Sequence, residues 1–137
     1  MTTVTDLRWK QIAVGGIAPY VISTGLLIVA IVGYTFLLAF GSGGEPDPGA
    51  VQQFNTISGT QIFPIATILL TIVTARWVAR RVDPGMATLH GVAVGVLAGI
   101  VGFSFGTFDV MMIVRFILTV GAGVLGARLP VLLGDEV

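Results

Sequence analysis

IAVGGIAPYVISTGLLIVAIVGYTFLLAF, residues 12–40, is an apolar run that contains no charged side chain. A helix needs roughly 20 consecutive apolar residues to cross the hydrocarbon core of a bilayer, which is about 30 Å thick. The run is long enough for one transmembrane helix and exceeds a straight crossing, so we expect this helix to tilt, kink or project. Gly15, Gly16 and Pro19 make its first turns the expected place for a kink.

Three more apolar segments follow, at residues 61–78, 86–105 and 110–133. The third of the four helices should begin after Asp83, because this side chain can cap a helix that has Pro84 in its first turn. A β-barrel is not expected, because barrel strands alternate in hydrophobicity over about ten residues and these runs are continuously apolar. The sequence therefore predicts an all-α fold, a bundle of four transmembrane helices that forms one domain over residues 1–137.

The composition is typical of an integral membrane protein. Of the 137 residues, 55% are hydrophobic and 10% are charged, and the mean hydropathy is +0.98. Soluble domains are about 25% charged, so too few polar side chains remain to cover a folded surface in water. Seven basic and seven acidic residues give no net charge, and we predict no nucleic-acid partner. With no cysteine and one histidine in the chain, we predict no metal and no cofactor.

The connections between the predicted helices differ in length. Residues 41–60 form an outer loop that is rich in glycine and proline, with room for a short interfacial helix at residues 50–54. The other two connections contain only a few residues. We therefore expect the second helix to lie antiparallel to the third, and the third to lie antiparallel to the fourth.

Basic residues determine the predicted orientation. Arg8 and Lys10 precede the first helix, Arg80 and Arg81 lie between the second and the third, and Arg128 lies near the end of the fourth. An even number of spans places all of them on one side, which the positive-inside rule identifies as the cytoplasm. We expect a multi-pass protein of the inner, cytoplasmic cell membrane with both termini in the cytoplasm.

Small residues form the strongest local pattern of the sequence. A row of glycines with GxxxG spacing runs along the third helix, and small residues recur on the fourth. Missing side chains let a second backbone approach closely. The two rows either pack on each other, which we expect, or the row of the third helix docks a second copy or another membrane subunit. The predicted helix-packing residues are Gly91, Gly95, Gly99, Gly102, Gly106, Ala122, Gly123, Gly126 and Ala127.

A mildly polar face on the second helix carries Thr67, Thr71 and Thr74 at helical spacing. A threonine hydroxyl can donate a hydrogen bond to the backbone of the preceding turn, so it needs no other partner in lipid. We interpret this face as a packing surface. The alternative is a polar path for a solute.

Arg115 is the one charged residue clearly inside an apolar span, about 8 Å from the start of the fourth helix. We expect its guanidinium to extend to the outer interface and to pair with an acidic residue, Asp109, Glu45 or Asp47, or with a lipid phosphate. The alternative is that Arg115 faces the bundle or an oligomer interface and binds an anionic group or a partner.

His90 and an arginine cluster lie toward the predicted cytoplasmic side. We expect His90 to be a histidine with satisfied hydrogen bonds, and the alternatives are proton transfer or ligation of a pigment. We expect Arg76, Arg80 and Arg81 to contact anionic lipid headgroups.

The C-terminal half contains HGVAVG at residues 90–95 and GAGVLGAR at residues 121–128. With these motifs the chain resembles small, uncharacterised, glycine-rich four-helix integral membrane proteins of prokaryotes. The resemblance implies a helical membrane fold and no particular activity for any residue.

The spans contain no catalytic triad, metal-ligand set or phosphate-binding loop, so we do not expect an enzyme. The first hypothesis is a non-catalytic small membrane subunit or scaffold that acts through helix packing with itself or with a larger membrane complex. The alternative is a small oligomeric channel or transporter with a threonine-lined path. The expected partners are the lipid bilayer and either copies of this chain or a larger membrane protein complex.

Overall fold

The computed structural model describes residues 7–106 and 108–132, and all regular structure in these ranges is helical. Four helices are long and apolar enough to cross a membrane, as a multi-pass membrane protein requires. They are Trp9–Gly41, Pro48–Ala79, Pro84–Phe105 and Val110–Leu129. The predicted all-α fold and the predicted number of spanning helices are therefore confirmed for the described residues.

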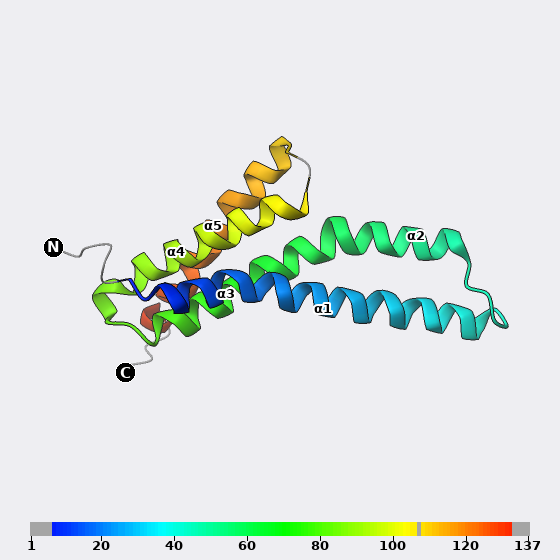
Figure 1. Ribbon diagram of the computed structural model, residues 1–137, viewed down its shortest axis with the longest axis horizontal. Coiled ribbons are helices and arrows are strands. Elements are labelled where there is room, and N and C mark those ends of the chain that lie inside the picture. Colours follow the sequence, from blue (N-terminus) through cyan, green and yellow to red (C-terminus); the bar gives the residue numbers. More distant parts are fainter. Residues whose placement is uncertain (1–6, 107, 133–137) are drawn as a thin grey trace.

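The helices form two antiparallel hairpins of different length (Figure 1). The long hairpin pairs α1 (Trp9–Gly41) with a continuous helix made of α2 (Pro48–Ile57), η2 (Ser58–Ile62) and α3 (Phe63–Ala79). The short hairpin pairs α4 (Pro84–Gly102), which ends in the 3₁₀ turn η3 (Phe103–Phe105), with α5 (Val110–Leu132). α3 packs on α4 and α4 packs on α5, as the short connections predict.

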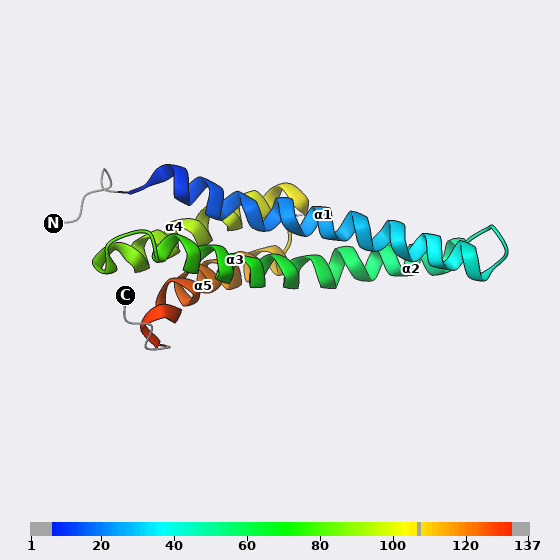
Figure 2. The ribbon, with the colours of Figure 1, turned by 90° about the horizontal axis from the view of Figure 1, so that it is seen from below.

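The two hairpins lie side by side along only part of the long hairpin. Figures 1 and 2 show that α4 and α5 lie against the first half of α1 and against α3, whereas the second half of α1 extends beyond them together with α2. In Figure 1 the ends of α4 and α5 near η3 also splay away from the long hairpin. The long hairpin therefore has an inner half inside the bundle and an outer half that contacts only itself.

The predicted outer loop at residues 41–60 is too long, because α2 begins at Pro48 and only residues 42–47 connect α1 to it. The short helix expected at residues 50–54 lies inside α2. Asp47 caps α2, and its carboxylate accepts hydrogen bonds from two backbone N–H groups of the first turn at 3.1 and 3.3 Å. Proline directly after a capping aspartate favours a helix start. The polar residues that follow residue 54 continue the helix beyond the predicted short segment and join it to α3 without a break.

The other helix boundaries differ from the predictions by a few residues. α1 begins three residues before the predicted position 12, at Trp9. α4 ends at Gly102 and the chain continues as a 3₁₀ turn to the predicted end at residue 105. Residue 133, the predicted end of the fourth helix, lies outside the described residues.

Pro64 explains why the second long helix changes its hydrogen bonding at η2. Proline has no N–H, and its ring clashes with the carbonyl four residues earlier, which here belongs to Thr60. The chain responds with a π-helical segment, in which the N–H of Phe63 bonds to the carbonyl of Ser58 five residues before it. The helix thus passes the proline without breaking, and the Thr60 carbonyl is open to a donor from another helix.

The core lies in the inner half of the long hairpin, where Ile12, Ala75, Val78 and Val94 from α1, α3 and α4 are buried together. The buried residues of α1 follow one helical stripe that ends at Ser23. None of residues 24–41 is buried. The packing of α1 therefore covers half of its length.

Candidate functional site

The glycine row of α4 faces α5 of the same chain. A Cβ atom on Gly91 would collide with Ala127 and would lie 2.6 Å from the carbonyl oxygen of Gly123. A Cβ atom on Gly95 would lie 2.8 Å from the Cα atom of Val120. The two backbones therefore approach so closely that no side chain fits between them.

The remaining small residues contact several helices. A Cβ atom on Gly99 would collide with a phenylalanine ring of α5, one on Gly102 would lie 2.5 Å from a tyrosine hydroxyl of α1, and one on Gly126 would collide with the backbone of α3. Gly106 has only an ordinary contact at 3.8 Å, and Ala122 is buried. Apart from Gly106, the predicted packing residues are therefore buried or in close contact with other parts of the same chain.

The threonine row of α3 lies mainly against α1. Thr67 donates to the carbonyl one turn earlier at 2.7 Å and lies 3.3 Å from the hydroxyl of Ser23. Thr71 donates to the carbonyl of Thr67 at 2.8 Å, and Thr74 donates to the carbonyl of Gly15 at 2.8 Å. Thr67 and Thr71 are buried. Within one chain these hydroxyls take part in helix packing, and Thr67 also lines the pocket described below. The polar path for a solute stays a prediction.

His90 joins α4 to the start of α1. Its side chain is 1% exposed. Nε2 accepts a hydrogen bond from the backbone N–H of Arg8 at 3.1 Å, and Nδ1 lies 2.9 Å from the carbonyl oxygen of Met86. These partners require the neutral tautomer with its proton on Nδ1. Both ring nitrogens are satisfied by backbone groups.

The arginine cluster lies at the end of α3, far along the helix from η2. The guanidinium of Arg81 lies 4.3 Å from the centre of the Trp77 ring, a cation–π contact. Arg76 lies in the last turn of α3, and Arg80 is its C-cap residue. The expected contact of this cluster with lipid headgroups stays a prediction.

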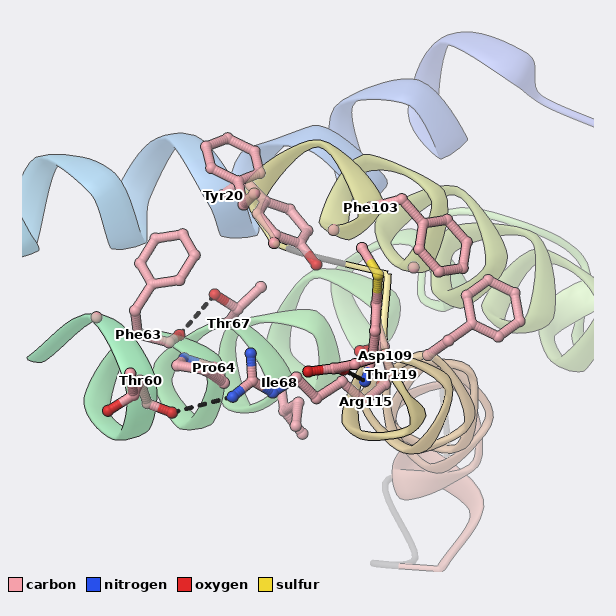
Figure 3. Close-up of a pocket in the computed structure, with 17 residues that line it drawn as sticks. Tyr20, Thr60, Phe63, Pro64, Thr67, Ile68, Phe103, Asp109, Arg115 and Thr119 are labelled. Carbon is pink, nitrogen blue, oxygen red and sulfur yellow. Dashed lines mark hydrogen bonds between the residues drawn. The ribbon is translucent and has the colours of Figure 1, made fainter. Parts of the chain in front are cut away.

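Arg115 lines a pocket of about 320 Å³ among α3, α4 and α5 (Figure 3). The pocket lies beside η2 and near the ends of α4 and α5. Its apolar wall is formed mainly by phenylalanine rings. Its polar groups come from Tyr20, Thr60, Thr67, Asp109, Arg115 and Thr119.

Arg115 connects α5 to the π-helical segment. One N–H of its guanidinium donates to the carbonyl oxygen of Thr60 at 3.1 Å, which is the carbonyl that Pro64 leaves without an α-helical donor. In the described part of the chain, Arg115 forms no ion pair with Asp109 or with the acidic residues of the α1–α2 connection. The expected pairing with a lipid phosphate stays a prediction.

Asp109 contributes the opposite charge to the same pocket. Its Oδ1 accepts a hydrogen bond from the backbone N–H of Met112 at 2.8 Å, which caps the first turn of α5. The second carboxylate oxygen has no hydrogen-bond donor among the described residues. A cation and an anion therefore line one cavity without pairing with each other.

Tyr20 closes the pocket from the side of α1. Its ring stacks on Phe105 at 5.3 Å between ring centres and meets Phe63 edge-on at 6.1 Å, and these contacts fix its direction. Figure 3 shows the hydroxyl pointing toward the cavity. Within the described ranges this hydroxyl has no hydrogen-bond partner.

Sequence reasoning named Arg115, Asp109 and Thr67 but missed Tyr20, Thr60 and Thr119, which line the same pocket. A proline four residues after Thr60 is a signal for an open carbonyl that the sequence already contains. The donor that fills it comes from a helix 55 residues later, and no local pattern indicates that pairing. Tyr20 joins the pocket only through the tertiary arrangement, whereas Asp109 lies at the start of the helix that carries Arg115.

Comparison of the chain with protein-family models, curated proteins and solved structures finds no match.

Proposed function

We propose that this chain is a non-catalytic subunit of a larger assembly in the cytoplasmic membrane, with both termini in the cytoplasm, and that it attaches through the outer half of its long hairpin. The orientation is supported by the basic residues that precede α1, follow α3 and occur late in α5. The attachment is supported by one observation, the apolar and unburied second half of α1.

The outer half of α1, residues 24–41, exposes large apolar side chains along its length. Val29 is 70% exposed, Leu37 is 71% exposed and Phe40 is 79% exposed. The 33 residues of α1 span about 50 Å at 1.5 Å per residue, whereas the hydrocarbon core measures about 30 Å. An average tilt of about 20° shortens this span only slightly. Part of the apolar surface therefore extends past the hydrocarbon.

The helix beside it has the opposite character. α2 exposes amide and hydroxyl side chains, among them Gln52, Gln53 and Asn55. Tyr34 of α1 stacks on Phe54 of α2 at 4.2 Å between ring centres, which holds the two helices together. The outer hairpin, formed by α2 and residues 24–41 of α1, thus pairs a polar helix with an apolar helix. An apolar helix face on another membrane subunit would cover the second and leave the first in water.

The interior of the bundle also favours a structural role. Thr67, Thr71 and Thr74 bond to backbone groups or pack against α1, and the glycine row of α4 is filled by α5. These groups stabilise the subunit itself. Exposed apolar side chains also occur on α3 and α5, but only those on the second half of α1 extend beyond the bundle, and we assign the partner to that half.

Native mass after mild detergent extraction, combined with cross-linking from single cysteines, tests this proposal. The chain contains no cysteine, so each introduced thiol is unique. We expect Leu37→Cys in the outer hairpin to cross-link in native membranes to a second copy or to another protein. Ile117→Cys, which is similarly exposed on α5, is the matched control and should not cross-link.

Extraction should yield a particle heavier than one chain with its detergent, and the composition of that particle identifies the partner. A particle that contains one chain only, with no cross-link from position 37, would refute the proposed attachment.

A further inference from the structure

Two opposite charges line the pocket beside η2, and each retains unused hydrogen-bonding capacity. Arg115 uses one N–H for the Thr60 carbonyl, although a guanidinium carries five N–H donors. Asp109 uses one oxygen to cap α5. A charge close to lipid is costly unless a partner neutralises it, and charged residues in spans therefore indicate a functional site. Neither charge neutralises the other here.

The Tyr20 hydroxyl is a third unused polar group. Tyr20 is 7% exposed, and its hydroxyl points toward the cavity without a partner in the described residues (Figure 3). Although most of the residue is buried, its hydroxyl is open to the cavity, where a ligand can reach it. An acceptor oxygen on a ligand in this pocket would satisfy both Tyr20 and the unused N–H groups of Arg115.

The walls indicate what the rest of the ligand is like. Phe63, Phe103 and Phe116 give the cavity an apolar lining. The pocket lies at the ends of α4 and α5, where spanning helices leave the hydrocarbon and meet the headgroup region. Its volume of about 320 Å³ is near the lower end of the range for small-molecule sites. A headgroup with the first part of its apolar chains matches this size and location.

We propose that the pocket binds a zwitterionic phosphate–ammonium group. The phosphate is bound by Arg115 and Tyr20, because guanidinium and hydroxyl groups donate to phosphate oxygens. The ammonium is bound by the free oxygen of Asp109. A simple anion would be repelled by Asp109 and a simple cation by Arg115, so a ligand carrying both charges is favoured. This site is separate from the outer hairpin and does not depend on the proposed attachment.

The test uses the full chain, purified in a non-ionic detergent and freed of lipid, with binding measured by native mass spectrometry and calorimetry. Dioctanoyl phosphatidylethanolamine carries both charges, and dioctanoyl phosphatidylglycerol carries the phosphate without the ammonium. Glycerophosphoethanolamine carries the headgroup without the chains. Tight binding of the lipid alone identifies the bilayer as the source, and equal binding of the soluble compound identifies a free zwitterion.

Each of two variants removes one charge but keeps the hydrogen bond that the residue makes to the backbone. Arg115→Gln retains an amide donor for the Thr60 carbonyl, and Asp109→Asn retains a good helix cap. The matched controls are Arg128→Gln, farther along α5, and Asp47→Asn, the cap of α2. Neither control residue lines the pocket.

We expect each pocket variant to weaken binding of the phosphatidylethanolamine about tenfold or more, as loss of charge-assisted hydrogen bonds does. The controls should stay within about twofold, because neither Arg128 nor Asp47 lines the pocket. Tyr20→Phe should also weaken binding, and it provides a test should Arg115→Gln fail to fold. Equal affinity for the two lipids, or unchanged binding in Asp109→Asn and Tyr20→Phe, would overturn the proposal.

Discussion

His90 illustrates how single residues of this bundle are fixed by backbone groups. Its side chain is buried, and its two ring nitrogens meet the N–H of Arg8 and the carbonyl of Met86. A buried polar side chain is tolerated when such partners exist, and it then specifies one arrangement of its neighbours. His90 thus determines where α1 begins relative to α4.

Replacing His90 should loosen the start of α1. His90→Ala leaves the Arg8 N–H without its acceptor and creates a cavity, so we expect a loss of about 1–3 kcal/mol in stability, seen as a lower midpoint of thermal unfolding in detergent. Leu89→Ala changes the neighbouring exposed side chain and is the control. Equal effects of the two substitutions would contradict a role for the histidine hydrogen bonds.

Arg115 and Pro64 should be energetically coupled. Pro64→Ala restores an N–H for the Thr60 carbonyl, so Arg115 is then no longer needed as a donor. We expect the destabilisation by Arg115→Met, which removes the donor, to be about 1 kcal/mol smaller in the Pro64→Ala background, measured as a double-mutant cycle of unfolding. Arg128→Met, which lies far from η2, should combine additively with Pro64→Ala.

At the scale of elements, the sequence predicts helices well where they are apolar and poorly where they are polar. α4 starts at Pro84 as predicted, but the Asp83 side chain forms no capping hydrogen bond, so the predicted cap is wrong. At Asp47 and Pro48 the side chain does cap α2, although the glycines and prolines around it predict turns. An aspartate followed by proline marks the helix start in both places, whereas the pocket has no local signal because Arg115 reaches Thr60 from a helix distant in sequence.

The contact between α4 and α5 gives a prediction for these two elements. Gly95→Leu would place a side chain where even a Cβ atom lies 2.8 Å from the α5 backbone, so the helices must separate. We expect an overpacking cost of about 1–3 kcal/mol and a lower unfolding temperature of the isolated chain in detergent. Gly121→Leu is the control, since a Cβ atom there meets nothing within 4 Å. An unchanged unfolding temperature in Gly95→Leu would contradict this packing.

At the scale of the whole molecule, the two hairpins have different lengths although both belong to one membrane protein. α4 has 19 residues and spans about 29 Å, close to the hydrocarbon thickness, whereas α1 has 33 residues. The apolar run that predicted the first span is thus longer than a membrane requires. The excess length carries the α1–α2 connection away from the bundle, which makes this connection a sensitive reporter of orientation.

Cysteine labelling of intact cells distinguishes the two orientations of the whole molecule. The basic residues at the α3–α4 end predict that this end is cytoplasmic and that the α1–α2 connection lies outside. Ser42→Cys should therefore react with an impermeant thiol reagent, and Gly85→Cys should react only after the cells are opened. Ser42 and Gly85 are both exposed, and a Cβ atom at Gly85 meets nothing within 4 Å, so accessibility differs only by the side of the membrane. The reverse labelling pattern would place the outer hairpin and the charged pocket on the cytoplasmic side, and the partner and the headgroup would then have to be sought in that leaflet.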